Sequence, residues 1–248
     1  MRNIGTLITT NIKNNFSAKS VTIIWYGLAL ILVAAMTALF GILLIAPELD
    51  KISPDRAKLD LYLGVILFTA SLLGLGINLN AVGFTSMIKE KSRGNIQSLL
   101  ATPLKLKDVW IGKSLAIFIP GLILGELLTI ISLIAVNYIY FVPTIGFLFN
   151  PWIAITTFIV FPVMYLCFGL LVYLLGLTGK PNNANIIALV FLPLFVNIVV
   201  QLLLRTSFMD FTSSWPFTLA NIGLTLVIAI LVIILQFRIS KEKVVLSY

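Results

Sequence analysis

The stretch from Ser114 to Val142 reads SLAIFIPGLILGELLTIISLIAVNYIYFV and holds a single ionisable residue, Glu126. A helix needs roughly 20 consecutive, mostly apolar residues to cross the ~30 Å hydrocarbon layer of a bilayer. The stretch exceeds that length. It therefore predicts a membrane-spanning α-helix with one acid near its middle.

Five further apolar runs lie on either side of this stretch, each near or above the same length. Of the 248 residues, 60% are hydrophobic and only 10% are charged, and the mean hydropathy is +1.09, whereas about 25% of residues are charged in soluble proteins. We therefore expect an all-α integral membrane protein with six transmembrane helices in one domain. The predicted spans are residues 21–46, 61–88, 114–142, 152–177, 186–204 and 217–237. The first is too long and too late for a signal-peptide core, so we expect the mature protein to keep it.

The basic residues are concentrated in alternating gaps between these runs. Thirteen of the seventeen Lys and Arg residues lie before the first run, in the second or fourth gap, or after the last run. The positive-inside rule predicts this distribution for cytoplasmic segments. We therefore expect a multi-pass protein of the cell membrane with both termini in the cytoplasm. The net charge of +8 then indicates topology, and we expect no nucleic-acid partner.

Apolar residues ahead of the first span recur at intervals of three and four, as on one face of a helix. They are Ile4, Leu7, Ile8, Ile12 and Phe16. The pattern predicts an amphipathic helix over residues 2–19, lying on the cytoplasmic surface of the membrane. A frayed tail is the alternative, because the Thr and Asn residues of this segment are poor helix formers.

The gap between spans two and three, residues 89–113, is strongly charged, and residues 89–110 of it are also patterned. Its residues Ile96, Leu99 and Leu100 are spaced as one face of a short helix. Pro103 disfavours helical geometry at the residue before it and so ends that helix. The segment therefore predicts a short amphipathic helix parallel to the membrane. An ordinary basic loop that only fixes topology is the alternative, and it leaves the apolar face unexplained.

Three pieces of this gap resemble the type-2 family of ABC transporter permeases, the membrane subunits of ATP-driven exporters. They are Glu90-Lys91-Ser92-Arg93-Gly94-Asn95, Leu99-Leu100-Ala101-Thr102-Pro103 and Gly112-Lys113. The resemblance implies that the segment is a coupling helix that docks on a separate ATP-binding subunit. It also implies a second permease copy or a homologous permease as partner. The residues expected to contact the ATP-binding subunit are Glu90, Lys91, Arg93, Gly94, Ile96, Leu99, Leu100, Thr102 and Pro103.

ATP hydrolysis is not expected on this chain. A phosphate-binding loop needs the pattern G-x-x-x-x-G-K-[S/T], whose backbone amides hold the phosphates. Gly112-Lys113-Ser114 has only the end of that pattern, since Lys107 stands where the first Gly belongs. We therefore expect a transport subunit that binds no cofactor, with ATP and Mg²⁺ on the partner.

Few polar residues lie inside the spans. Glu126 is the only ionisable one, and an intramembrane acid is costly enough to suggest a functional role or a bonded partner. The candidates for a translocation pathway are Glu126, Asn78, Asn197 and Gln201. Joining neighbouring helices is the alternative for each, and we favour it for most of the amides. The transported substrate is not identified; lipids, lipid-linked glycans, drugs and peptides all fit a largely apolar pathway.

Two other functional classes compete with the exporter subunit. An ion-coupled carrier or channel would use Glu126 as its proton site and need no ATP-binding subunit. An intramembrane enzyme is the less favoured class, because the chain has no His and no paired intramembrane carboxylates.

Overall fold

A computed structural model describes residues 2–16, 19–78, 105–178, 215–237 and Val244, and within these residues all regular structure is helical. The α-helices are α1 (Arg2–Asn15), α2 (Lys19–Phe40), α3 (Ala46–Leu49), α4 (Arg56–Asn78), α7 (Leu106–Val136), α8 (Pro151–Ile155), α9 (Phe161–Thr178) and α11 (Trp215–Gln236). Three π-helical segments continue them without a break: η1 (Gly41–Ile45), η3 (Asn137–Phe141) and η4 (Thr156–Val160).

Five of the helical stretches in this part of the chain are long and apolar enough to cross a membrane. They are Thr22–Leu49, Arg56–Asn78, Leu106–Phe141, Pro151–Leu177 and Trp215–Gln236. Each overlaps one of the predicted spans, so the prediction of an all-helical, membrane-embedded chain is confirmed. The predicted span 186–204 lies outside the described residues.

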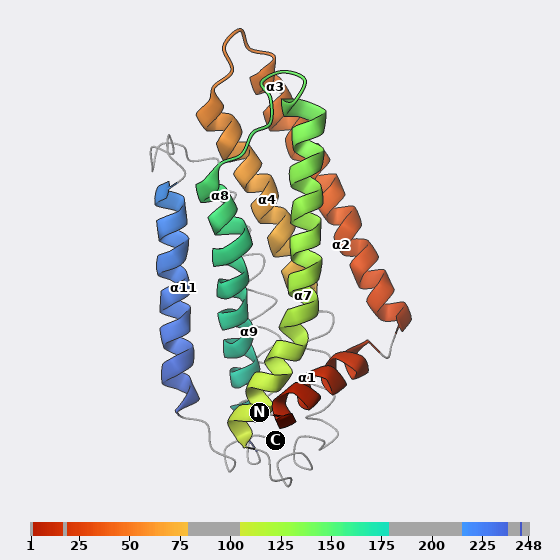
Figure 1. Cartoon of the computed structure of the whole chain (residues 1–248), viewed down its shortest axis with the longest axis vertical. Coiled ribbons are helices and arrows are strands. Elements are labelled where there is room, and N and C mark those ends of the chain that lie inside the picture. Colours follow the sequence, from red (N-terminus) through yellow and green to blue (C-terminus); the bar gives the residue numbers. More distant parts are fainter. Residues whose placement is uncertain (1, 17–18, 79–104, 179–214, 238–243, 245–248) are drawn as a thin grey trace.

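The spanning helices run side by side in an elongated bundle, and α4 lies at its centre (Figure 1). In the most apolar part of α4, 72% of the residues are buried, against 22% in the α2 stretch and 28% in α11. Helices α2 and α7 run toward the end that carries α3, whereas α4, α9 and α11 run away from it (Figure 1). Helix α4 is therefore the core element, and α2 and α11 are peripheral.

Helices α4 and α7 cross at very close range, because both carry glycine at the contact. A Cβ atom added to Gly74 of α4 would lie 2.6 Å from the Cα of Gly125. One turn earlier in α7, a Cβ on Gly121 would lie 2.7 Å from the Nδ2 of Asn78. Gly121 and Gly125 have the GxxxG spacing that lets membrane helices approach backbone to backbone. The centre of the bundle is therefore built on glycine contacts.

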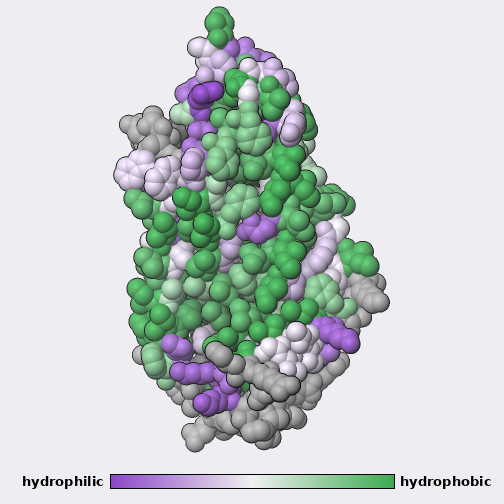
Figure 2. Space-filling model, viewed as in Figure 1, coloured by the Kyte–Doolittle hydropathy of each residue, from purple (hydrophilic) through white to green (hydrophobic). Residues whose placement is uncertain are grey.

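The outward faces of the bundle are apolar. Large side chains such as Ile31 of α2, Leu127 of α7 and Ile230 of α11 are more than half exposed. Figure 2 shows hydrophobic residues over most of the visible face, with hydrophilic residues gathered mainly toward its two ends. Since lipid tails are the solvent for such a surface, these faces are the expected lipid contacts of a membrane protein.

One end of the bundle brings together α1, the start of α7 and Val244. The side chain of Leu7 on α1 occupies the space that a Cβ on Gly112 of α7 would need. Val244, close to the end of the chain, is fully buried in a cluster with Leu106 and Trp110 of α7. The predicted amphipathic helix over 2–19 is thus present as α1, ending at Asn15. It packs against the third of the predicted spans.

Helix α7 begins earlier than the sequence indicates. Span three was expected from residue 114, with a coupling segment over 89–110, but α7 starts at Leu106. The first turns hold together because Trp110 is buried and its Nε1 donates a hydrogen bond of 3.0 Å to the backbone oxygen of Leu170 in α9. Residues 106–110 therefore belong to the third spanning helix, and the rest of the coupling segment up to residue 104 lies outside the described residues.

Candidate functional site

Most of the predicted site residues lie outside the part of the chain that the structure describes. These are Glu90, Lys91, Arg93, Gly94, Ile96, Leu99, Leu100, Thr102, Pro103, Asn197 and Gln201. Of the predicted set, Asn78 and Glu126 are described. The structure does not bring these two together: Asn78 is fully buried beside Gly121 of α7, and Glu126 is partly buried further along the same helix.

Asn78, at the end of α4, joins three helices. Its Oδ1 accepts a hydrogen bond of 2.8 Å from the Tyr26 hydroxyl of α2, and its Nδ2 donates one of 2.6 Å to the backbone oxygen of Ile117 in α7. The second bond falls next to the turn of α7 that Pro120 disturbs, since proline has no N–H to give to the carbonyl four residues earlier. These contacts support the alternative that Asn78 joins neighbouring helices. Its role in a pathway stays a prediction.

Glu126 occupies a different setting, near the middle of α7. Its immediate neighbours in the helix include Ile123 and Leu127, which are 57% and 54% exposed. Among the described residues, none makes a hydrogen bond or an ion pair with the Glu126 carboxyl group. Glu126 itself is partly exposed, and one turn earlier Leu122 packs against the cluster that α7 forms with α9.

The opposite end of the bundle from α1 carries a buried acid that does have partners. Glu48 of α3 is only 5% exposed, and its Oε2 accepts a hydrogen bond of 2.6 Å from the Nζ of Lys51. Its Oε1 lies 3.4 Å from the backbone nitrogen of Asp55. The hydrogen bond to Glu48 raises the pKa of Lys51 above its ordinary value. This cluster fixes the connection between α3 and α4.

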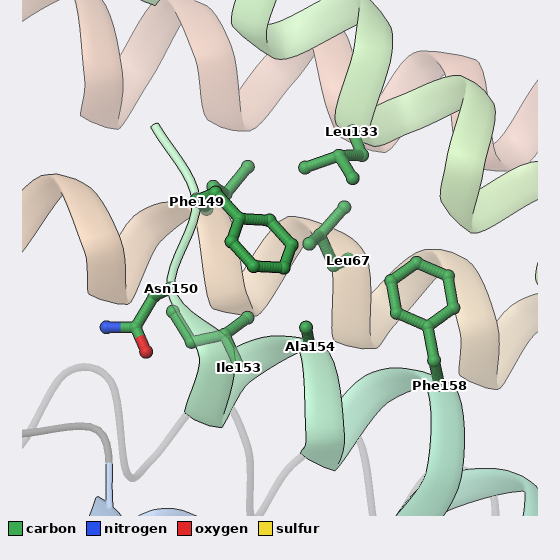
Figure 3. A pocket seen from close by; sticks show the side chains of 8 residues that line it. Leu67, Leu133, Phe149, Asn150, Ile153, Ala154 and Phe158 are labelled. Atoms are coloured by element: carbon green, nitrogen blue, oxygen red, sulfur yellow. The ribbon is translucent and has the colours of Figure 1, made fainter. Parts of the chain in front are cut away.

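A shallow groove opens between α4, α7 and the segment from α8 to η4, with a cavity volume of only about 10 Å³. Figure 3 shows that Leu67, Leu133 and Phe158 line it, while the amide of Asn150 points away from it. That amide donates a hydrogen bond of 3.0 Å to the Oδ2 of Asp60 in α4. Ligand pockets are usually about 300–1,000 Å³ and hold convergent polar groups. The groove is smaller than that, and its apolar lining offers no acid or base chemistry.

The described residues do not form a candidate metal site either. Within them, no three Cys, Asp or Glu side chains come together as a metal site would require. The single Cys167 lies on α9 and is partly buried. Asn78 and Glu126 are therefore the two predicted site residues whose surroundings the structure describes.

Within the described residues, five helices long and apolar enough to span a membrane pack around a glycine-rich contact, as in a multi-pass membrane protein. A comparison with known protein families, curated proteins and solved structures finds no match to this chain. Its membrane class therefore follows from its own helices and their surface.

Proposed function

We propose that the chain is the membrane subunit of an ATP-driven exporter of the type-2 ABC permease kind, situated in the cell membrane. Its spanning helices would form part of the transport pathway with a second permease copy or a homologous permease. A separate ATP-binding subunit, holding ATP and Mg²⁺, would dock under residues 89–104 and move the spans through that segment. The proposal comes from the resemblance of this segment to the family.

The main structural support for the proposal lies at one end of the bundle, where α1 and Val244 pack against the start of α7. Residues 89–104 directly precede α7 in the sequence, and α7 begins at this same end. Lys105 and Lys107 are exposed there, whereas the other end carries a mixture of acids and bases that includes Glu48 and Lys51. The positive-inside rule favours the first of these ends as cytoplasmic. An ATP-binding partner would be found on that side.

The direction of the helices supports a sixth crossing. Helices α9 and α11 run the same way along the bundle (Figure 1). The chain between Thr178 and Trp215 has to return from one end to the other, and an apolar run at residues 186–204 lies in that interval. A sixth span there would place both termini on the cytoplasmic side, as the family plan requires.

The docking proposal is tested by co-purification. The double substitution Leu99→Asp and Leu100→Asp puts two carboxylates on the predicted apolar face of the coupling segment and should abolish capture of a tagged ATP-binding subunit co-expressed with this chain. The variant should still insert in the membrane and elute at its normal size.

Ile52→Asp is the matched control. Ile52 is fully exposed in the loop between α3 and α4, at the opposite end of the bundle, so an added carboxylate there should leave capture unchanged. Undiminished capture by the Leu99→Asp/Leu100→Asp variant would remove the coupling claim.

A further inference from the structure

Helix α7 passes through a proline and a glycine without ending. Pro120 lies inside the helix and has no N–H, so the carbonyl of Ala116 lacks the hydrogen bond that residue 120 would otherwise donate. Gly121 follows directly and adds backbone freedom at the same turn. Sharp bends in long helices occur at such residues, and Figure 1 shows α7 changing direction toward its end beside α1. The backbone of α7 is therefore least constrained by its own hydrogen bonds at this turn.

The two sides of the turn have different main neighbours. The near arm, Leu106–Ile117, contacts α1 at Gly112 and α9 through the hydrogen bond of Trp110. The far arm, Gly121–Val136, contacts α4 at Gly125 and also packs against α2. A hinge joins two parts of a structure that are each held by their own contacts. The packing of α7 has this form on either side of the turn.

Asn78, the last residue of α4, is inserted at the turn itself. A Cβ added to Gly121 would lie 2.7 Å from its Nδ2 and 3.2 Å from its Cγ, so the amide fills the space that a larger residue at 121 would need. From there the Nδ2 donates its 2.6 Å hydrogen bond to the oxygen of Ile117, at the end of the near arm. Neighbouring helices make proline tolerable in a spanning helix by bonding the backbone of the disturbed turn. Asn78 therefore ties the near arm to α4.

The Asn78 amide is itself held in place by α2. The hydroxyl of Tyr26 donates a hydrogen bond of 2.8 Å to its Oδ1, which leaves the Nδ2 directed at Ile117. The ring of Tyr26 meets that of Phe16 edge to face, with the ring centroids 6.0 Å apart. The bond to the near arm is thus anchored in α2 and α4, the same helices that hold the far arm.

We propose that Pro120-Gly121 is a hinge in α7 and that Asn78 is the latch that holds it in one position. With the bond to Ile117 formed, the two arms are fixed relative to each other. With that bond broken, the near arm moves relative to α2 and α4, while the contact between Gly74 and Gly125 stays closed. The hinge does not rest on the exporter proposal, because each of its contacts joins described helices of this chain.

Distances between paired spin labels report the hinge directly. Cys167→Ala first removes the single cysteine of the chain. The hinge pair then consists of labels at Lys107→Cys on the near arm and Ile24→Cys on α2, both exposed positions. The control pair keeps Ile24→Cys and places the second label at Ile134→Cys, an exposed position of the far arm. The purified full chain is measured in phosphatidylcholine vesicles by double electron–electron resonance.

The substitution Asn78→Leu keeps the size of the side chain and removes both hydrogen bonds. It should raise the population of a second hinge-pair distance about threefold to twentyfold, the range that corresponds to one interhelical hydrogen bond. The control pair should not change. Tyr26→Phe should give a smaller shift in the same direction, because the bond to Ile117 remains. Adding Pro120→Ala to Asn78→Leu restores the N–H at residue 120 and should return a single narrow distance.

Three results would overturn the proposal. They are an unchanged hinge-pair distribution in Asn78→Leu, equal broadening of both pairs, and no recovery when Pro120→Ala is added. Equal broadening would mean that Asn78 only supports the bundle as a whole. If Asn78→Leu does not yield folded protein, Tyr26→Phe with and without Pro120→Ala is judged by the same three criteria.

Discussion

The close crossing of α4 and α7 makes a sharp prediction for Gly74→Ala. The added Cβ would lie 2.6 Å from the Cα of Gly125 and 3.0 Å from its nitrogen, where ordinary contact begins at 3.4 Å. Both neighbouring atoms belong to the backbone, so no side chain can turn aside. The two helices must separate by about 0.8 Å at this point, and the packing around the centre of the bundle loosens with them.

Overpacking of this kind costs about 1–3 kcal/mol, which corresponds to a fall in Tm of roughly 2–12 °C for a chain of this length. Gly27→Ala is the matched control, because a Cβ on Gly27 of α2 meets nothing within 4 Å. Both substitutions gain the same helix propensity, up to about 1 kcal/mol. The difference between the two variants therefore isolates the contact with Gly125.

The assay is thermal unfolding of the detergent-purified chain, followed by loss of the monodisperse peak in size-exclusion chromatography. Gly27→Ala should match or exceed the unaltered chain, and Gly74→Ala should fall below both. A Tm for Gly74→Ala equal to that of Gly27→Ala would refute the close-approach argument.

Two further predictions concern the polar contacts at the ends of the spans. Tyr26→Phe removes one donor to Asn78 and should cost about 0.6 kcal/mol of stability, the average for interhelical hydrogen bonds. Asn78→Leu also removes the bond to the Ile117 oxygen and should therefore lower the Tm further in the same thermal assay. Equal losses for the two variants would argue against Asn78 joining both α2 and α7. Because its hydrogen bond to Glu48 raises the pKa of Lys51 above 10.5, the stabilisation is present below that value and is lost as the pH rises through the raised pKa. The Tm advantage over Lys51→Met should therefore stay constant up to about pH 10 and decline above about pH 10.5, and an advantage that does not change above that pH would contradict the ion pair.

Hydropathy predicts the membrane class of this chain well, because crossing a bilayer demands long apolar runs. It predicts helix ends less well. The run beginning at Ser114 marks where the apolar residues start, yet α7 already begins at Leu106. Its first turns are held by contacts with α9, such as the hydrogen bond from Trp110 to Leu170. Those contacts come from residues far away in the sequence and leave no local signal.

Helix packing could be predicted only in part. The GxxxG pair of Gly121 and Gly125 is visible in the sequence, but its partner Gly74 belongs to no such motif and is identified only by the crossing itself. The π-helical segments could not be predicted from local sequence either. Gly41 of η1 lies so close to the Tyr140 ring of η3 that an added Cβ would come within 2.6 Å of it. Such bulges depend on a neighbouring helix and not on local propensity.

The side of α7 on which Glu126 lies could not be predicted from the sequence either. Helix α7 is apolar on nearly all sides, so the periodicity around Glu126 does not show which side turns inward. Asn78 was easier, because an amide in a span most often joins helices, and its bonds to Tyr26 and Ile117 are of that kind. The sequence thus predicted the types of polar residue that matter, while their orientation required the packed helices.

The packing of α1 against α7 constrains the order in which these helices can assemble during synthesis. Leu7 occupies the space beside Gly112, and more than a hundred residues of chain separate the two. The ribosome therefore completes α1 and two spanning segments before the surface that receives Leu7 exists. Helix α1 is therefore made well before it can reach its place, and until then its apolar side needs the membrane surface or a chaperone to cover it.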